Sequence, residues 1–204
     1  MCYAAWGSKN PATDSAEGYI GNLLTQKHYS PLEHSSYTFY LSGISRAASH
    51  EIVRHRHFSF SQKSQRYVLD REPFEISLHP SIEAEYGEEP TDFIENTLSS
   101  FESCLAFYED LRERGLTHKQ ASEAARQVLP NAAAVNIVVT GNARSWMEFI
   151  SKRDSDSADK ELHVIARQTN EMLAQELPEV FGTEARKLWE ESFSQAGTKS
   201  SEKF

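Results

Sequence analysis

Residues 50–71 read HEIVRHRHFSFSQKSQRYVLDR, and they concentrate positive charge in an otherwise acidic chain. The stretch holds five of the 21 Lys and Arg residues and only two acids, whereas the whole chain of 204 residues has a formal net charge of -9. Uncharged hydrogen-bonding side chains lie between the cations, at Ser59, Ser61, Gln62, Ser64 and Gln65. This mixture suits a ligand with phosphates at one end and amide-like edges at the other. The alternative is a solvated helix end followed by an amphipathic strand, because runs of charge commonly face water.

The residues in and before this stretch predict a helix followed by a strand. Apolar residues recur at four-residue spacing through the segment 44–55, at Ile44, Ala48 and Ile52. The last turn of this helix would carry the basic residues 54–56, at a place where the helix dipole favours cations with or without a ligand. Phe58 and Phe60 then alternate with serines, so the backbone is expected to become extended with its polar side chains on one face.

Two histidines of the predicted helix superficially match the helix of a zinc protease. His55 follows His50 by five residues instead of four, which places the two rings about 140° apart around the helix. The pair therefore does not face a common ion, and the sequence predicts no metal site.

The spacing between the basic residues 54–56 and a later serine resembles the signature of a known enzyme family. Arg54, His55 and Arg56 are followed by seven residues and then by Ser64, which is similar to the Arg-His-Arg-x7-Ser signature of the flavin-dependent thymidylate synthases. The resemblance covers roughly residues 2–181 and includes Ser30-Pro31-Leu32-Glu33-His34, Ser64-Gln65-Arg66-Tyr67, Leu129-Pro130-Asn131, Thr140-Gly141-Asn142, Arg144 and Arg153.

Composition and length limit the classes of protein to which this chain can belong. A chain of this size can bury a substantial core, so a single domain over residues 1–194 is expected, followed by a polar, disordered tail at 195–204. Cys2 and Cys104 are too few for a disulfide framework, which favours a reducing, cytoplasmic location. The sequence has neither a membrane-length apolar run nor a signal pattern. Its acidic balance argues against broad binding to nucleic acid.

Hydrophobic periodicity places the remaining elements. Helices are predicted over residues 14–27, 91–114, 118–129, 142–153, 160–175 and 184–193, and strands over 36–41 and 134–140. Segments 28–34 and 70–90 contain prolines and are expected to form loops, with a short strand at 74–78. The resemblance implies an α+β fold with a small, twisted, mainly antiparallel sheet flanked by long helices. The family's first strand would precede Cys2, so this chain is expected to lack it.

Arg153 lies in line with an apolar stripe on the helix predicted over residues 142–153. It follows Trp146 by seven residues, which is only about 20° around a helix, and Phe149 and Ile150 share the stripe. The guanidinium could snorkel to solvent, but a partly buried guanidinium that faces a ligand edge explains the position equally well.

The resemblance implies two ligand sites. No Gly-x-Gly-x-x-Gly fingerprint is present, so side chains must hold the flavin pyrophosphate. The FAD site is assigned to Ser30, Arg54, His55, Arg56, Gln62, Asn142, Ala143, Arg144 and Glu148, with His28 close to flavin and folate. The dUMP site is assigned to Glu51, Ile52, Val53, Arg54, Gln62, Lys63, Ser64, Gln65, Arg66, Arg126 and Arg153. His28 could instead be an ordinary hydrogen-bonded loop residue.

Two of these positions have further consequences. Glu148 stands where the family usually has His or Asn, and an acid there weakens anion binding unless Arg144 neutralises it. An ion pair between Arg144 and Glu148, four residues apart, is the simple expectation. Ser64 is read as a hydrogen-bond donor to the nucleotide, because the family's reaction requires no enzyme nucleophile.

The implied reaction is the reductive methylation of dUMP to dTMP. Methylenetetrahydrofolate would give the carbon, reduced FAD the hydride, and NADPH would recharge the flavin. The resemblance also implies a homotetramer whose active sites are built from several subunits, with Arg153 as the catalytic residue. The alternatives are a nucleotide or flavin-binding module, such as a sensor, that has lost turnover, and a purely structural helical protein with basic surface residues.

Overall fold

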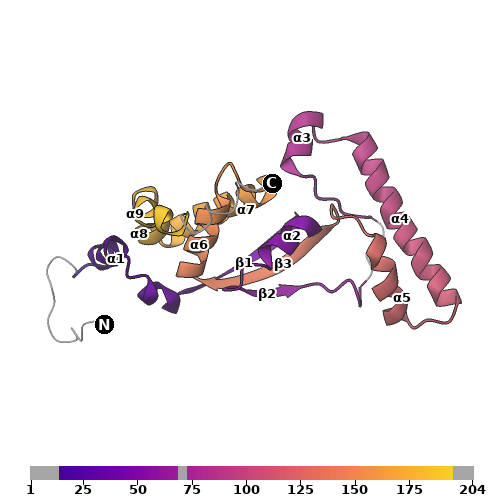
Figure 1. The fold of residues 1–204 in the computed structure, drawn as a ribbon, viewed down its shortest axis with the longest axis horizontal. Helices are drawn as coiled ribbons and strands as arrows, with labels where there is room; N and C mark the ends of the chain where they lie inside the picture. Colours follow the sequence, from indigo (N-terminus) through magenta and orange to yellow (C-terminus); the bar gives the residue numbers. More distant parts are fainter. Residues whose placement is uncertain (1–13, 69–72, 195–204) are drawn as a thin grey trace, which may run out of the picture. The chain divides into compact units, whose positions relative to one another are not determined.

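The strands of this protein form a small antiparallel sheet (Figure 1). They are β1 (Ser36–Ser45), β2 (Ser59–Gln62) and β3 (Ala134–Asn142), and β3 lies in the middle. Ser59 of β2 pairs with Thr140 of β3, and Gln62 pairs with Ile137. The computed structural model describes residues 14–68 and 73–194. Mixed helix and strand with a small antiparallel sheet is the predicted fold class, which is thereby confirmed.

The chain divides into two compact units, and β1 and β3 both run across the division. The terminal unit comprises Met1–Tyr37 with Gly141–Phe204, and the central unit comprises Thr38–Thr140. This division does not test the expectation of a single domain over residues 1–194, which stays a prediction. The expected tail at 195–204 and the place of the family's first strand lie outside the described residues.

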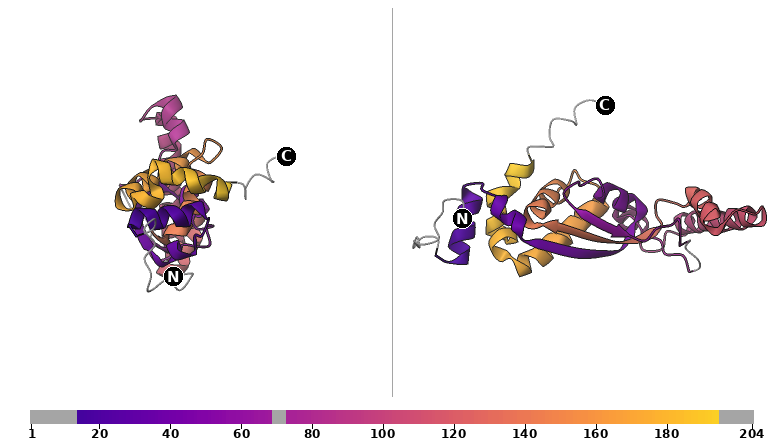
Figure 2. Two further views of the ribbon diagram at one scale, coloured as in Figure 1. Left: turned by 90° about the vertical axis from the view of Figure 1, so that its left-hand side faces the viewer. Right: turned by 90° about the horizontal axis from the view of Figure 1, so that it is seen from below.

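The described part of the terminal unit is a helical assembly. Its helices are α1 (Ala16–Thr25), the 3-10 helix η2 (Ser30–His34), α6 (Ala143–Arg153), α7 (Lys160–Glu176), α8 (Pro178–Phe181) and α9 (Thr183–Ser194). Helix α6 packs against α7 and α9, and α1 packs against α8 and α9 (Figure 2). Trp146, Phe149 and Ile150 of α6 are fully buried, and the Trp189 indole donates to the Val180 carbonyl at 2.7 Å. The predicted apolar stripe of α6 therefore faces the core.

The central unit contains a pair of helices that lie side by side (Figures 1 and 2). Its helices are α2 (Arg46–Ile52), α3 (Pro80–Tyr86), α4 (Thr91–Glu113), α5 (His118–Ala125) and the 3-10 helix η3 (Arg126–Val128). Helices α4 and α5 share a core of Cys104, Tyr108, Ala121 and Ala125. Thr117 and Gln120 form a reciprocal capping box that starts α5. Cys104 is 1% exposed, so its side chain belongs to this core.

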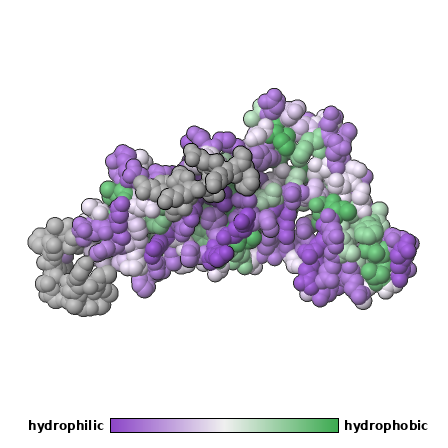
Figure 3. Space-filling view, in the orientation of Figure 1, coloured by the Kyte–Doolittle hydropathy of each residue, from purple (hydrophilic) through white to green (hydrophobic). Residues whose placement is uncertain are grey.

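Helix α3 and the start of α4 line a cavity of about 540 Å³. Ile82, Tyr86, Pro90 and Phe93 supply its apolar lining, and Figure 3 shows hydrophobic side chains where α3 lies in Figure 1. None of the residues assigned to the flavin or the nucleotide lines this cavity.

Several local predictions were wrong for identifiable reasons. The expected loop at 28–34 contains η2, because the fixed φ of Pro31 suits the first turn of a helix. The expected loop at 70–90 contains α3, which begins with Pro80 for the same reason and is capped by His79. The strand predicted over 36–41 is too short, because β1 continues through Gly43, whose positive φ of 70° is a conformation that glycine adopts without strain. No helix in the described part of the chain combines enough length with enough apolar character to span a lipid bilayer.

Candidate active site

The basic residues 54–56 follow helix α2 instead of forming its last turn. The Ser45 hydroxyl accepts a hydrogen bond from the Ala48 N–H at 3.0 Å, so the helix begins at Arg46, and it ends at Ile52. The His55 N–H then donates to the Ile52 carbonyl at 3.0 Å in a tight turn. The predicted helix over 44–55 is therefore too long at both ends, but the cations remain next to the negative end of the helix dipole.

Side chains alternate in direction along this turn. Arg54 and Arg56 are exposed, whereas His55 is partly buried, with its ring centroid 6.2 Å from that of Phe58. Two guanidinium groups therefore face outwards from one short turn that is held by its helix and by an aromatic contact. Such paired, charge-assisted donors suit an anionic ligand.

Helix α2 is tied to strand β2 by one side-chain hydrogen bond. The Gln62 amide nitrogen donates to the Ser49 hydroxyl at 3.3 Å, which brings the end of β2 beside the helix that carries Glu51 and is followed by Val53. Glu51 is partly buried and Val53 is 40% exposed. Ile52 is only 1% exposed, so its side chain belongs to the core and only its backbone is available to a ligand.

The segment after β2 carries the densest group of predicted nucleotide contacts. Lys63 and Ser64 are exposed, and the Ser64 hydroxyl accepts from the Arg66 N–H at 3.4 Å. Gln65 is only 7% exposed, and its Nε2 is buried without a hydrogen-bond partner among the described residues. A buried amide donor without a partner is costly, so it indicates a position where a ligand or water completes the bond.

Arg66 is held by an acid that the sequence did not single out. Its Nε and Nη2 atoms lie 2.7 and 2.6 Å from Glu123 Oε1 on α5, and the hydrogen bond to Glu123, followed by its charge, raises the pKa of Arg66. Arg126, which follows α5 and begins η3, is partly buried. The α5–η3 segment therefore provides both a support for Arg66 and another residue assigned to the nucleotide, Arg126.

In the terminal unit, Asn142 starts helix α6 as predicted. Its Oδ1 accepts from the N–H and from the hydroxyl of Ser145, both at 2.9 Å. Ala143 is completely buried, and its N–H donates to the Ser35 carbonyl at 3.1 Å. His28 and Ser30, which precede and begin η2, are both exposed.

The Asn142 cap gives a stability prediction. Asn142→Ala is expected to lower the free energy of unfolding by about 1 kcal/mol, because two donors at the start of α6 lose their acceptor. Urea denaturation followed by far-UV circular dichroism measures this loss. Asn142→Asp keeps an acceptor oxygen and is the matched control, so an equal loss in both variants would refute the capping role.

Arg144 and Glu148 of α6, which were expected to form an ion pair with each other, each contact another charged residue. Arg144 Nη1 bonds Glu33 Oε1 on η2, and Glu148 Oε1 lies 2.5 Å from Lys152 Nζ one turn later. Lys152 therefore supplies a charge that compensates Glu148, a role that was expected of Arg144. Arg153, the last residue of α6, is partly buried beside the fully buried stripe of Trp146.

Hydrogen bonds tie three of the predicted site residues to neighbouring elements of their own unit. Within the central unit, Gln62 is hydrogen-bonded to Ser49 of α2, and Arg66 is hydrogen-bonded to Glu123 of α5. Within the terminal unit, Arg144 joins η2 to α6. In residues 14–68 and 73–194, no group of three or more His, Cys, Asp or Glu side chains is arranged to hold a metal ion.

The fold and these side chains define an α+β protein with exposed arginines and a buried amide donor, and its sequence has no glycine-rich phosphate loop. Residues 1–179 match the model of the family described as thymidylate synthase complementing protein. The chain is 41% identical over 186 residues to the flavin-dependent thymidylate synthase of Mycobacterium tuberculosis (strain ATCC 25618 / H37Rv), with 88% of this chain and 74% of that protein covered.

Two further relatives bear the same name. The enzyme of Mycobacteroides abscessus is 42% identical over 191 residues, with 89% of this chain and 74% of the relative covered. That of Mycolicibacterium vanbaalenii is 40% identical over 191 residues, with coverages of 88% and 74%. The chain therefore belongs to the flavin-dependent thymidylate synthase family of enzymes, as its Arg-His-Arg-x7-Ser motif indicates.

Proposed function

We propose that this protein synthesises dTMP by reductive methylation of dUMP, with methylenetetrahydrofolate as carbon donor and FAD as carrier of the hydride from NADPH. The observation that carries the proposal is the family match over residues 1–179, which contains every residue assigned to the two ligands. Identity of 40–42% over most of the chain supports a retained activity.

The nucleotide set fits dUMP chemically. Arg66 and Arg126 provide cations for a phosphate, and the buried Nε2 of Gln65 provides an amide donor that needs an acceptor. The Ser64 hydroxyl is exposed and can donate, since its oxygen already accepts the Arg66 N–H. Phosphate, sugar and uracil edges supply the complementary acceptors.

The flavin set also fits its group. Arg54 and Arg56 present two exposed guanidiniums that match a pyrophosphate, and Lys152 compensates the Glu148 carboxylate. When bound, FAD supplies the hydride-transfer chemistry that amino-acid side chains lack. The residues of this chain contribute binding, orientation and electrostatic stabilisation.

Arg153 carries the catalytic role in this proposal. Its guanidinium holds the uracil edge and stabilises the negative charge that develops as N3 loses its proton, so the ring becomes nucleophilic at C5. A fixed donor that is partly shielded from water serves this purpose at little reorganisation cost. The chain itself needs no covalent nucleophile.

Two measurements test the proposed function. The purified protein should show a flavin absorption band, and it should convert dUMP to dTMP with methylenetetrahydrofolate and NADPH. Binding of flavin and dUMP without turnover would identify a nucleotide-binding module instead, and absence of both would identify a structural protein. We also propose that the protein works as a homotetramer with shared active sites, which light scattering after size exclusion measures.

Ser64 separates a binding role from a nucleophilic one. Ser64→Ala is expected to weaken dUMP binding yet retain dTMP formation at saturating dUMP, because it removes one neutral hydrogen bond, about 0.5 to 1.5 kcal/mol. Steady-state kinetics over a range of dUMP concentrations measures both effects. Normal dUMP binding with no turnover would show that Ser64 acts in the chemistry itself.

A further inference from the structure

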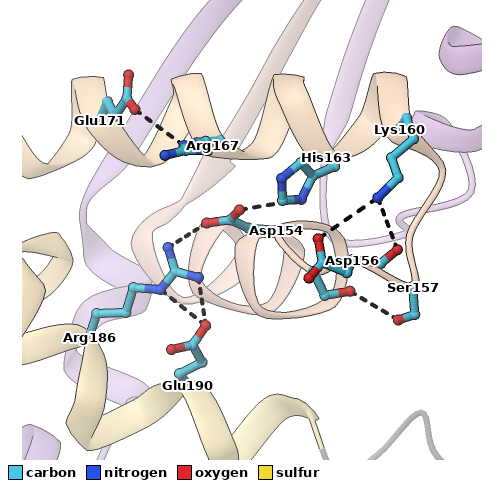
Figure 4. Close-up of polar contacts among 10 residues, drawn as sticks. Asp154, Asp156, Ser157, Lys160, His163, Arg167, Glu171, Arg186 and Glu190 are labelled. Atoms are coloured by element: carbon cyan, nitrogen blue, oxygen red, sulfur yellow. Dashed lines mark hydrogen bonds and ion pairs between the residues drawn. The ribbon is translucent and has the colours of Figure 1, made fainter. Parts of the chain in front are cut away.

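Helix α6 ends in a charged cluster directly after Arg153. Asp154 caps the helix, and its N–H donates to the Ile150 carbonyl at 2.8 Å. Its side chain is 12% exposed and receives Arg186 Nη1 at 2.6 Å (Figure 4). The other carboxylate oxygen lies 3.5 Å from His163 Nδ1 of α7. Asp154, the residue that follows Arg153, is therefore held by an ion pair to α9 and lies beside α7, where His163 Nδ1 makes no hydrogen bond among the described residues.

Arg186, on α9, is the centre of this cluster (Figure 4). Its side chain is 17% exposed and reaches Asp154 with one nitrogen and Glu190 Oε1 with two, at 3.1 and 2.5 Å. Burial is the largest single effect and would lower the pKa of Arg186, but the bonds to Glu190 and Asp154 together raise it above its usual value. One guanidinium thus joins the end of α6 to α9 in its charged form.

A second contact joins the same two helices on the other side of Arg153. The Ser151 hydroxyl donates to the Glu190 backbone carbonyl at 2.9 Å, and Ser151 is buried. Ser151 precedes Arg153 by two residues, and Asp154 follows it by one. The backbone of Arg153 is therefore anchored to α9 from both sides, although the last turn of a helix commonly frays.

Stability alone is a weak reason for such a cluster. Partly buried ion pairs lose much of their Coulombic gain to desolvation, and apolar residues of similar volume often stabilise equally well. Directional bonds do offer a fixed geometry. A long arginine side chain that must meet one edge of a substrate benefits from a backbone that cannot shift.

We infer that Arg186, acting through Asp154 and Glu190, is a positioning residue that directs Arg153 towards the uracil ring. This role rests on the proposed function, since it assigns Arg153 to dUMP. It adds a residue of α9, 33 positions beyond Arg153 in the sequence, to the determinants of nucleotide binding. The chain's own ionic cluster would then set both the affinity for dUMP and the turnover.

A double-mutant cycle with dUMP binding as readout tests the inference. The FAD-saturated protein is titrated with dUMP by calorimetry, as wild type, Arg186→Met, Arg153→Ala and the double variant. Arg186→Met is expected to weaken dUMP binding about fivefold in the wild type but to cause no further loss in Arg153→Ala, because coupled residues do not act additively. A purely structural role predicts the same loss in both backgrounds.

Two more variants make the test decisive. Lys187→Met removes the same charge from the next residue of α9, an exposed lysine paired with Glu184, and should leave dUMP affinity unchanged. Asp154→Asn keeps the side-chain shape and removes the charge that Arg186 contacts, so it must show the same coupling to Arg153. This variant also tests the inference if Arg186→Met does not fold. Additive losses, or an unchanged affinity in Asp154→Asn, overturn the positioning role alone. A wild type that binds no dUMP overturns the proposed function and the positioning role with it.

Discussion

Arg153→Lys is expected to lower dTMP formation by roughly tenfold or more while flavin binding and folding persist, because lysine keeps the charge and loses the planar fork. Arg153 ends α6 beside the buried Trp146 stripe, and its neighbour Asp154 is anchored by Arg186. The guanidinium is thus directed by the fold instead of being free to rotate on a flexible surface. Separate measurement of dTMP formation and of flavin reduction by NADPH locates the defect.

The same substitution at an exposed arginine is the control for Arg153. Arg167 lies on α7, has a side chain that is 67% exposed and forms an i,i+4 pair with Glu171. Arg167→Lys should therefore leave turnover near the wild-type value, since such surface pairs contribute little. If Arg153→Lys also kept normal dTMP formation, the guanidinium would be a snorkelling surface group, and Arg153 would leave the mechanism.

The sequence predicted the long helices well because two local signals coincide in them. Helix α6 begins at a good N-cap, Asn142, and carries an apolar stripe, so its predicted and observed bounds agree. Helices α4 and α7 each differ from the prediction by one residue at one end. Periodicity also places Met172 with the inward-facing residues of α7, but this side chain is 56% exposed.

Short elements were predicted less well because one local contact decides them. The Ser45 hydroxyl caps α2 and sets its start at Arg46, and the helix ends at Ile52, before the motif arginines. Pro31 and Pro80 each suggested a loop, but a proline also suits the first turn of a short helix. Periodicity cannot distinguish these outcomes over five to seven residues.

For the candidate site, the motif indicates which residues to examine but not what holds them. Arg66 meets Glu123, 57 residues later, and Arg144 meets Glu33, 111 residues earlier, whereas the sequence favoured Glu148 as the partner of Arg144. A charge four residues away is visible in any helical sequence, but partners from other elements require the tertiary fold. The contact of Arg186 with Asp154 was missed for the same reason.

Arg54→Ala and Arg56→Ala are each expected to lower flavin affinity about tenfold or more, because a charge-assisted hydrogen bond to phosphate contributes roughly 1.5 to 3 kcal/mol. Both side chains are exposed on the turn after α2, so neither change should disturb the core. The partly buried His55 between them keeps the turn in contact with Phe58. Flavin titration of the apoprotein, followed by absorbance, measures the dissociation constant of each variant.

A matched control separates a specific flavin contact from a general loss of charge. Arg114, in the same central unit, is an exposed arginine paired with Asp110 at the end of α4, so Arg114→Ala removes one charge far along the chain from the motif. Its flavin affinity should equal that of the wild type. The flavin affinity of the wild type should also fall as the salt concentration rises, because salt screens the attraction between arginine and phosphate. This fall should be less steep in Arg54→Ala and Arg56→Ala, since each variant has lost one of the arginines. Unchanged flavin affinity in both motif variants would show that the two guanidiniums serve another ligand, and the pyrophosphate would then have to be held by other cations of the chain.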